Sequence, residues 1–465
     1  MQKIIITILL LFSIQFIFAQ NFYLGADLSY VNEMEDCGVT YQEDGNTKNV
    51  HTIFSDSGCN LVRLRLWHTP SWYDDLNTGK RYSDLADVKI AINRAKQNGM
   101  NVLLDFHLSD SWADPSSQLV PTAWLPVVDD INILKDSLYN YIFSTLTELH
   151  SENLLPEMIQ IGNETNKGIL LSPQDNQVWT LDWNRNATLF NRAIQAVRDF
   201  EDQNNENVKI VIHVADPSNA EWLVDGFISN GVTDFDIIGL SYYWAWHMPT
   251  TIADAGNVIQ TLRNFYPDKE VLIVETGYIW TTAWNDNAAN IISETHPDYT
   301  PASPENQRDW LIDLTKEVIA KNGLGVIYWE PAWVSSPCFT QWGQGSHQEH
   351  AAFFDFDNNL LIPGGIEWMS YNYDILSDTK DLAPDAIVQI MTNSFSGDVK
   401  IRQLNGNTFN VEYIVTDASG KVIVKNQTRQ NTISFQLNSA PFGVYIVVVK
   451  IDGQLISKQF VFSDK

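Results

Sequence analysis

Two glutamates stand where buried strands are expected to end, and they could act as a catalytic pair. Glu164 closes the apolar run IQIGNE, and Glu275 closes the run VLIVE. A strand that is apolar throughout and then ends in a carboxylate places that carboxylate in a cleft. A carboxyl group with a raised pKa can hold a proton near neutral pH, while a second, ionised one can act as a nucleophile. Two carboxyl groups on opposite sides of one bond are the arrangement that glycoside hydrolysis requires.

Eight short β-rich runs, separated by amphipathic helical stretches, must position these side chains. They cover residues 22–28, 60–67, 101–107, 157–164, 208–215, 235–243, 270–277 and 323–330. Several are almost continuously apolar, as strands buried on both faces are. Eight strand–helix units over roughly 310 residues predict an α/β fold, a (β/α)8 TIM barrel, with a doubly wound open sheet as the competing topology. In the barrel, Glu164 and Glu275 end the fourth and seventh strands and face each other across the mouth.

The other strand ends are polar as well, and together they carry more information than any one of them. Asn163 can hydrogen-bond a sugar hydroxyl, and either Arg63 or Arg65 could keep a nucleophile ionised. Aromatic rings that can stack on sugars come after the eighth strand: Trp329, Trp333 and Trp342. Taken singly, each of these residues could instead be a salt-bridge partner or a packing residue.

Composition excludes several classes of protein. The 29 basic and 57 acidic side chains give a net charge of −28, so phosphate backbones would be repelled and no nucleic-acid partner is expected. The 44% of apolar residues can fill a large core, which excludes a disordered chain. No GxSxG, HExxH, GxxxxGK or GxGxxG motif is present, and no cofactor is expected for catalysis. The cysteines, Cys37, Cys59 and Cys338, have no metal-binding spacing and do not support a disulfide framework, and whether Cys37 and Cys59 pair stays open.

The two ends of the chain differ from its middle. Residues 1–19 read as a secretory signal peptide, which predicts a secreted or cell-surface protein with no membrane span. Residues 20–375 form the expected barrel, and residues 393–465 show short strands and turn signals typical of a small all-β sandwich. This last part has 8 basic and 5 acidic residues, a net charge of +3, against −31 for the remainder.

Six stretches resemble glycoside hydrolase family 53, the endo-β-1,4-galactanases. They are LGADLSYVNEMEDCGVTY (24–41), LVRLRLWHTP (61–70), LLDFHLSDSWADPSSQLVPTAW (103–124), QIGNETNKGILL (160–171), VETGYIW (274–280) and GVIYWEPAWV (325–334). The resemblance implies a retaining barrel enzyme with Glu164 as acid/base and Glu275 as nucleophile. It also implies that five residues line the sugar subsite at the cleavage point: Asn163, Arg65, His107, Tyr242 and Trp329.

The substrate implied by the resemblance is β-1,4-galactan, as in the type I arabinogalactan side chains of pectin. Asp110, Trp112 and Asp114 in the SDSWADP segment are candidates for recognising that chain, with helix capping or loop packing as the alternative. Trp333 is a further candidate for stacking on a sugar. The alternative functions are a related barrel enzyme acting on another β-linked plant polysaccharide such as mannan, and a catalytically silent sugar-binding protein.

Two segments depart from the family pattern, and a terminal module extends beyond it. Where many bacterial members carry a calcium loop, this chain has TTAWNDNAAN, in which Asn285, Asp286 and Asn287 offer oxygen ligands to a structural calcium ion. The run SYYWAWHMP (241–249) lacks the proline that often follows the paired tyrosines. The terminal module resembles the sorting domain of the type IX secretion system in DASGKVI (417–423), FGVYIVVVK (442–450) and KQFVF (458–462), which implies that this export machinery is a partner.

Overall fold

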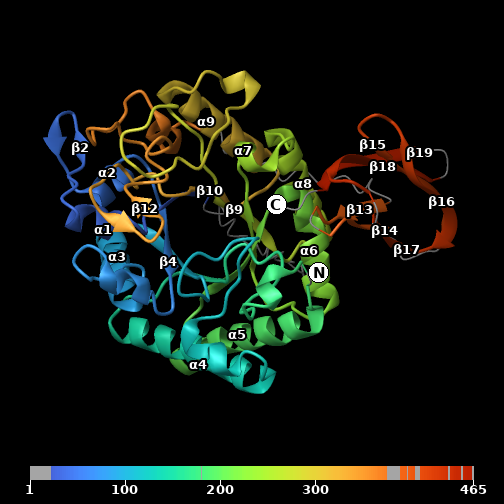
Figure 1. Ribbon diagram of the computed structural model, residues 1–465, viewed down its shortest axis with the longest axis horizontal. Coiled ribbons are helices and arrows are strands. Elements are labelled where there is room, and N and C mark those ends of the chain that lie inside the picture. Colours follow the sequence, from blue (N-terminus) through green and yellow to red (C-terminus); the bar gives the residue numbers. More distant parts are fainter. Residues whose placement is uncertain are drawn as a thin grey trace, which may run out of the picture.

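A closed barrel of eight parallel strands forms the larger part of the molecule (Figure 1). The computed structural model describes residues 22–179, 181–373, 388–394, 396–403, 409–437, 440–451 and 454–462. The expected signal peptide at residues 1–19 lies outside this range. The strands follow the order β1-β10-β9-β8-β7-β6-β5-β4 around the ring, and β1 closes it by pairing with both β4 and β10. The TIM barrel predicted from the sequence is therefore confirmed.

All eight predicted strands are present, each a little shorter than its apolar run. Their bounds are β1 Tyr23–Asp27, β4 Leu61–Leu66, β5 Asn101–Phe106, β6 Met158–Ile161, β7 Lys209–Ala215, β8 Ile237–Ser241, β9 Glu270–Glu275 and β10 Gly325–Tyr328. Apolar side chains inside the barrel form a separate cluster, here called the plug, on the side away from the mouth. Its members are Leu61, Leu103, Met158, Val211, Ile237, Leu272, Val274, Leu324 and Ile327. The plug fills the interior below the polar strand ends, so only the mouth is available for a ligand.

Helices surround the barrel and cover the outer faces of its strands (Figure 1). They are α1 Val31–Asp36, α2 Val50–Asp56, α3 Leu85–Gln97, α4 Ile131–Ser151, α5 Trp183–Asn204, α6 Pro217–Ser229, α7 Trp244–His247, α8 Ile252–Phe265 and α9 Pro304–Ala320. Short 3-10 helices occupy Ser71–Asp75, Thr122–Val127, Asp175–Gln177, Pro297–Tyr299 and Gly365–Met369. In α3, for example, the Asp84 side chain caps the first turn, and Val88, Ile92 and Ala95 form the buried stripe.

The C-terminal part consists of antiparallel sheets, as the sequence predicts. One sheet has the order β13-β14-β17 and the other β16-β15-β18-β19. The strands are β13 Val388–Thr392, β14 Asp398–Gln403, β15 Phe409–Asp417, β16 Val422–Gln430, β17 Thr432–Gln436, β18 Gly443–Ile451 and β19 Gln454–Phe462. Because β13 pairs with β14, the all-β module starts before residue 393, the boundary expected from the sequence.

The module packs beside α6, on the flank of the barrel (Figure 1). Asp225 on α6 is only 2% exposed and forms ion pairs with Lys400 and Arg402 of β14. Lys458 of β19 lies 3.1 Å from Glu221, also on α6. The net positive module therefore meets carboxylates of the acidic barrel directly.

A disulfide joins two distant segments, contrary to the expectation that no disulfide framework is present. Cys37, at the end of α1, is bonded to Cys338, which lies 301 residues further along the chain. Cys59 is buried and free, so it does not pair with Cys37. Cys338 directly precedes a small hairpin formed by β11 Phe339–Thr340 and β12 Gly343–Gln344; a second hairpin consists of β2 Gln42–Glu43 and β3 Asn46–Thr47. Within the described ranges, no helix is both long and apolar enough to cross a membrane.

Candidate active site

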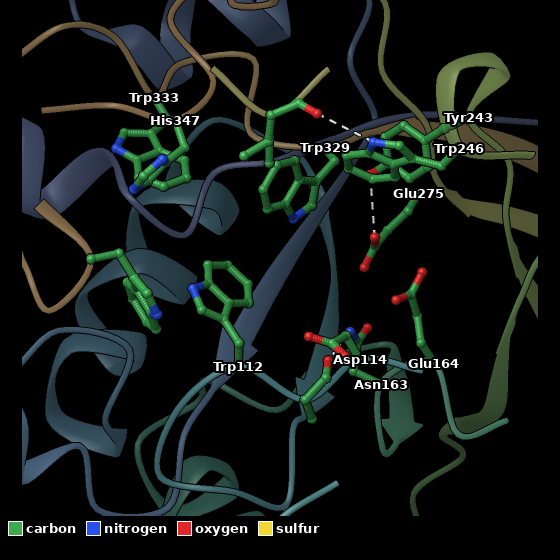
Figure 2. A pocket seen from close by; sticks show the side chains of 13 residues that line it. Trp112, Asp114, Asn163, Glu164, Tyr243, Trp246, Glu275, Trp329, Trp333 and His347 are labelled. Carbon is green, nitrogen blue, oxygen red and sulfur yellow. Dashed lines mark hydrogen bonds between the residues drawn. The ribbon is translucent and has the colours of Figure 1, made fainter. Parts of the chain in front are cut away.

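A pocket of about 300 Å³ lies at the carboxyl ends of the barrel strands (Figure 2). Both glutamates singled out from the sequence line it. The complete lining is Trp112, Ala113, Asp114, Asn163, Glu164, Tyr243, Trp246, Glu275, Ile291, Trp329, Trp333, Trp342 and His347. In Figure 2 the carboxyl groups of Glu164 and Glu275 point toward each other from opposite walls, with open space beside them.

Glu275 is held by two donors at the end of β9. Its Oε1 lies 2.8 Å from Nη1 of Arg63, and its Oε2 accepts a hydrogen bond of 3.2 Å from the hydroxyl of Tyr243. The side chain is 6% exposed, so little water is available to replace these donors. Both contacts favour the ionised form and leave the carboxylate oriented toward the pocket.

Glu164 has a different environment, three residues beyond the end of β6. Its backbone lies in the left-handed region with φ of 45°, and its amide donates to Nδ1 of His213 over 3.2 Å. Gln118 donates to the carbonyl oxygen of Glu164 over 3.1 Å. A non-glycine residue held in this conformation is a strained position of the kind found at functional sites.

The two carboxyl groups differ in how readily they hold a proton. Burial raises the pKa of Glu275 to about 7, and the adjacent Arg63 opposes that rise. Burial and the negative charge of Glu275 raise the pKa of Glu164 well above its usual range, and a hydrogen bond with Ser241 and the positive charge of Arg63 oppose this rise. Glu164 is therefore the group that keeps its proton and Glu275 the group that ionises first. The two environments suit an acid and a nucleophile.

Arg63 is the centre of a buried polar network beneath the pocket. It is 1% exposed, and its guanidinium contacts Asp27 at 3.0 Å and Asp105 at 2.7 Å, in addition to Glu275. It also donates to Oδ1 of Asn163 over 2.7 Å. Because the Asn163 amide donates to the carbonyl of Ala113 over 2.7 Å, the side chain of this asparagine is fixed at the pocket floor.

Tryptophan side chains form the wall to one side of the two carboxyl groups. Figure 2 shows Trp112, Trp329 and Trp333 gathered there. The ring centroids of Trp112 and Trp329 are 5.8 Å apart at a steep angle, and Trp333 stacks on the buried Tyr30 at 3.9 Å. Aromatic faces held by such packing present rigid apolar surfaces against which sugar rings can lie.

Arg65 and His107, expected at the sugar subsite, lie beneath the pocket and do not line it. The Arg65 guanidinium is 1% exposed, lies over the rings of Tyr30, Trp67 and Trp112, and forms an ion pair with Glu330. His107 is 2% exposed and lies 2.9 Å from Asp105. Arg63, the alternative on the same strand, makes the contact with Glu275. Arg65 instead supports the tryptophan wall from behind.

The sequence analysis expects Tyr242 at the sugar subsite, but the adjacent Tyr243 is the tyrosine that lines the pocket. Tyr242 does not line the pocket, because its side chain points outward, stacks near Trp310 of α9 and donates to the carbonyl of Thr250 over 2.9 Å. Tyr243 points inward and reaches Glu275. Alternation along the strand explains the difference, since Ser241 points inward to His213 and the next inward position is Tyr243. That alternation was the signal that would have identified Tyr243.

The SDSWADP segment divides into pocket residues and loop residues. Trp112 and Asp114 line the pocket, and one Asp114 oxygen is bonded to the amides of Ser116 and Ser117. Asp110 does not line it, because its carboxylate accepts from the amides of Thr69 and Thr122 and so ties two loops together. Trp246, Ile291 and His347 were not singled out from the sequence, because long loops after β8, β9 and β10 bring them in.

The residues proposed for calcium do not fit a cation. Asp286 supplies the one carboxylate of the set, and its two oxygens accept from the amides of Ala288 at 2.9 Å and Ser346 at 2.7 Å. The side chain of Asn285 donates to Ser335, and that of Asn287 donates to Gln344. The one carboxylate of the set therefore already accepts from two backbone amides, and the two asparagine side chains bond to other side chains through their amide nitrogens. Over the described ranges, no cluster of three or more His, Cys, Asp or Glu side chains could hold a metal ion.

Comparison with known proteins gives one consistent result for the barrel. Residues 23–363 match the sequence model of glycosyl hydrolase family 53. The chain is 46% identical over 345 residues to an arabinogalactan endo-β-1,4-galactanase of Cellvibrio japonicus, covering 73% of this chain and 89% of the relative. It is 33% identical over 356 residues to an endo-β-1,4-galactanase of Bacillus subtilis, covering 72% and 78%.

A solved structure gives the same result. The GH53 catalytic domain of Ignisphaera aggregans superposes with a TM-score of 0.66 and 32% identity, over 75% of this chain and 95% of that one. The family match over residues 23–363 includes the positions of all the residues that line the pocket.

Proposed function

The chain belongs to glycosyl hydrolase family 53, and from that premise we propose that it is a secreted endo-β-1,4-galactanase that acts with retention of configuration. The observation that carries this proposal is the pair of unequal carboxyl groups, Glu164 and Glu275, facing each other beside a tryptophan wall. The Cellvibrio and Bacillus relatives are endo-β-1,4-galactanases, which supports the choice of β-1,4-galactan. A neutral polysaccharide also agrees with a pocket that is mostly aromatic.

In the proposed mechanism the two glutamates divide the chemistry. Glu275 attacks the anomeric carbon and forms a glycosyl-enzyme ester, while Glu164 transfers its proton to the leaving glycosidic oxygen. Glu164, now ionised, removes a proton from water, and the resulting hydroxyl group displaces Glu275 from the sugar. Arg63 and Tyr243 hold Glu275 in position for attack through their bonds of 2.8 Å and 3.2 Å. No cofactor takes part in these steps.

Recognition of the substrate falls to the fixed polar and aromatic groups of the pocket. Galactose has an axial 4-hydroxyl, so a β-1,4-galactan chain bends where cellulose runs straight. Within the chain the axial O4 of each internal galactose carries the glycosidic bond, so the site must recognise the bent chain and the hydroxyl groups that stay free. A polymer of another shape would leave polar groups of the site unpaired, and it is rejected for that reason. Asp114 is the candidate acceptor for one of these free hydroxyl groups, since only its Oδ1 is used by the 114–117 turn. The wider context that we propose is degradation of the galactan side chains of pectin.

Export is the remaining part of the proposal. Residues 1–19 read as a signal peptide, and the C-terminal module resembles a type IX sorting domain, which together favour release from the cell or display on its surface. The antiparallel sheets of the module and its position on the flank of the barrel support a role outside catalysis.

The test is digestion of a panel of polysaccharides at equal mass: linear β-1,4-galactan, galactomannan, xylan and soluble cellulose. We expect initial rates on galactan to exceed the others by at least about a hundredfold, and early products to be a mixture of chain lengths. Nuclear magnetic resonance of the first product should show the β-anomer. Comparable rates on mannan, or an α-anomeric first product, would contradict the assignment.

A further inference from the structure

We propose that the disulfide between Cys37 and Cys338 is a positioning element for substrate binding: it holds the β11–β12 hairpin, and with it Trp342, as the outer part of the pocket wall. The inference rests on the proposed function, because a wall position matters only when a long sugar chain binds along it. It concerns neither the acid nor the nucleophile. It assigns a role to the covalent bond that the sequence did not predict.

Trp342 is poorly held by its own packing. Its side chain is 40% exposed, although it lines the pocket. Its ring lies edge-on to Trp72 with a centroid distance of 5.3 Å and is tilted against Trp112 at 6.0 Å, so neither contact is a stacked one. The hairpin that carries it has two residues in each strand, and an isolated two-stranded ladder of this size is not stable in water. The position of Trp342 therefore depends on what fastens the base of the hairpin.

One covalent bond and several hydrogen bonds fasten that base, among them those from the Gly345 amide to the carbonyl of Cys338 and from the Gln344 side chain to the carbonyl of Ser336. The disulfide is at Cys338, directly before β11. At the next residue, the Asn77 side chain donates to the carbonyl of Phe339 and accepts from its amide, both over 2.8 Å. At the other strand, Gln344 accepts from the side chain of Asn287. Asn77 and Asn287 are at the surface, where water competes for their hydrogen bonds, whereas the disulfide cannot be exchanged for water.

The other end of the disulfide is on a rigid element. Cys37 ends α1, whose Val31 and Met34 are each 1% exposed and pack into the core of the barrel. The amide of Cys37 donates to the carbonyl of Glu33 over 2.9 Å, so the cysteine is part of the last turn of the helix. The bond thus fixes a surface hairpin to the wall of the barrel. The proposed catalytic carboxyls do not depend on it, because they extend from β6 and β9.

The disulfide is open to reduction, which makes the proposal testable on the intact protein. Both cysteines are partly exposed, while Cys59 is buried and free. Dithiothreitol would donate two electrons and two protons to the bond, yielding two thiols and its own cyclic disulfide. Cys59 provides a matched control, since its replacement removes a cysteine without touching the hairpin.

The experiment compares full-length wild type with Cys338→Ser and Cys59→Ala. Each is assayed on long β-1,4-galactan and on an aryl β-galactoside too short to reach Trp342. We expect Cys338→Ser to raise KM for the long substrate about fivefold, with kcat within about twofold, because an aromatic contact is lost from binding. Turnover of the aryl substrate should not change. Treatment of wild type with dithiothreitol should reproduce this pattern, and Cys59→Ala should behave as wild type.

A second comparison separates positioning from general stabilisation. In a Trp342→Ala background, which lacks the ring, Cys338→Ser should cause no further rise in KM. Any of three results would overturn the proposal. They are a further rise in KM in the Trp342→Ala background, an equal loss of activity on the aryl substrate, and an unchanged KM in Cys338→Ser. If wild type itself does not cleave galactan, the proposed function fails instead, and the two failures can be told apart.

Discussion

The guanidinium of Arg63 lies 2.8 Å from the carboxylate of Glu275 and is itself almost completely buried. Burial alone would drive Glu275 to hold a proton, and Arg63 is the cation that opposes this. Among the described residues Glu164 forms no ion pair, and burial and the negative charge of Glu275 raise its pKa. One buried arginine therefore gives two similar side chains different protonation states, on which an acid and a nucleophile in one pocket depend.

Replacing each glutamate should have a different effect. Glu275→Ala should abolish turnover of every substrate, because no glycosyl-enzyme can form. Glu164→Ala should lower the rate on galactan by about 10²- to 10⁴-fold but spare aryl galactosides with good leaving groups, which need no proton in the first step. Steady-state rates on both substrates check this. Equal losses on both in Glu164→Ala would contradict its role as the acid.

Arg63→Lys should move the acid limb of the pH–rate profile to higher pH. That limb reports ionisation of Glu275, and a shorter lysine would oppose the effect of burial less well than the guanidinium does. The measurement is kcat/KM against pH for folded protein, with folding checked by near-ultraviolet circular dichroism. An acid limb that stays in place, or moves to lower pH, would show that Arg63 does not set the ionisation of Glu275.

Tyr243→Phe and Tyr242→Phe form a matched pair on adjacent residues. Tyr243→Phe removes the hydroxyl that reaches Glu275, so kcat should fall about 10- to 100-fold, as expected for a hydrogen bond to a charged group. Tyr242→Phe removes a bond to the carbonyl of Thr250, so it should cost about 1 kcal/mol of stability and leave kcat nearly unchanged. A large fall in kcat in Tyr242→Phe, with kcat nearly unchanged in Tyr243→Phe, would instead support Tyr242 as the subsite residue that the sequence predicts.

Glu33 should make the barrel less stable as pH rises. Burial raises its pKa to about 8, and Tyr73 donates to it over 2.7 Å. Since the folded-state pKa is above the unfolded value of about 4.3, its favourable contribution is complete below that value and is lost as pH rises toward 8.

Glu33→Gln, which carries no charge, should therefore match wild type at pH near 4 and unfold at a temperature a few degrees higher at pH near 9. Thermal unfolding at both pH values measures this, with the exposed Glu294→Gln as control. A variant less stable than wild type at the higher pH would show that the ionised carboxylate is stabilising.

Removal of the C-terminal module should leave catalysis intact. No described residue of the module lines the pocket, and its ion pairs are made with α6 on the flank. A chain ending near residue 385 should keep kcat on galactan within about twofold but, if the proposed sorting role holds, should not reach the surface of the cell that produces it. Loss of catalysis in a folded truncated protein would place the module in the active site.

The sequence by itself determined the barrel and the positions of its two principal carboxylates. Strands buried on both faces must be apolar, so eight apolar runs identify them, and the residues that end the runs must lie at the mouth. Glu164 and Glu275 were found in this way, as were Asn163 and the tryptophans after β10.

Only the tertiary structure decided which of two residues on the same face of a strand reaches the pocket, and which distant segments meet. Arg63 and Arg65 both point inward, and their different partners, Glu275 and Glu330, come from strands more than 200 residues away in sequence. Cys37 meets Cys338 across 301 residues, and no local pattern encodes such a pairing. The spacing of apolar residues indicates which face of its own helix or strand a residue occupies. Contacts between elements depend instead on the closed ring, which brings the strand ends and their loops together.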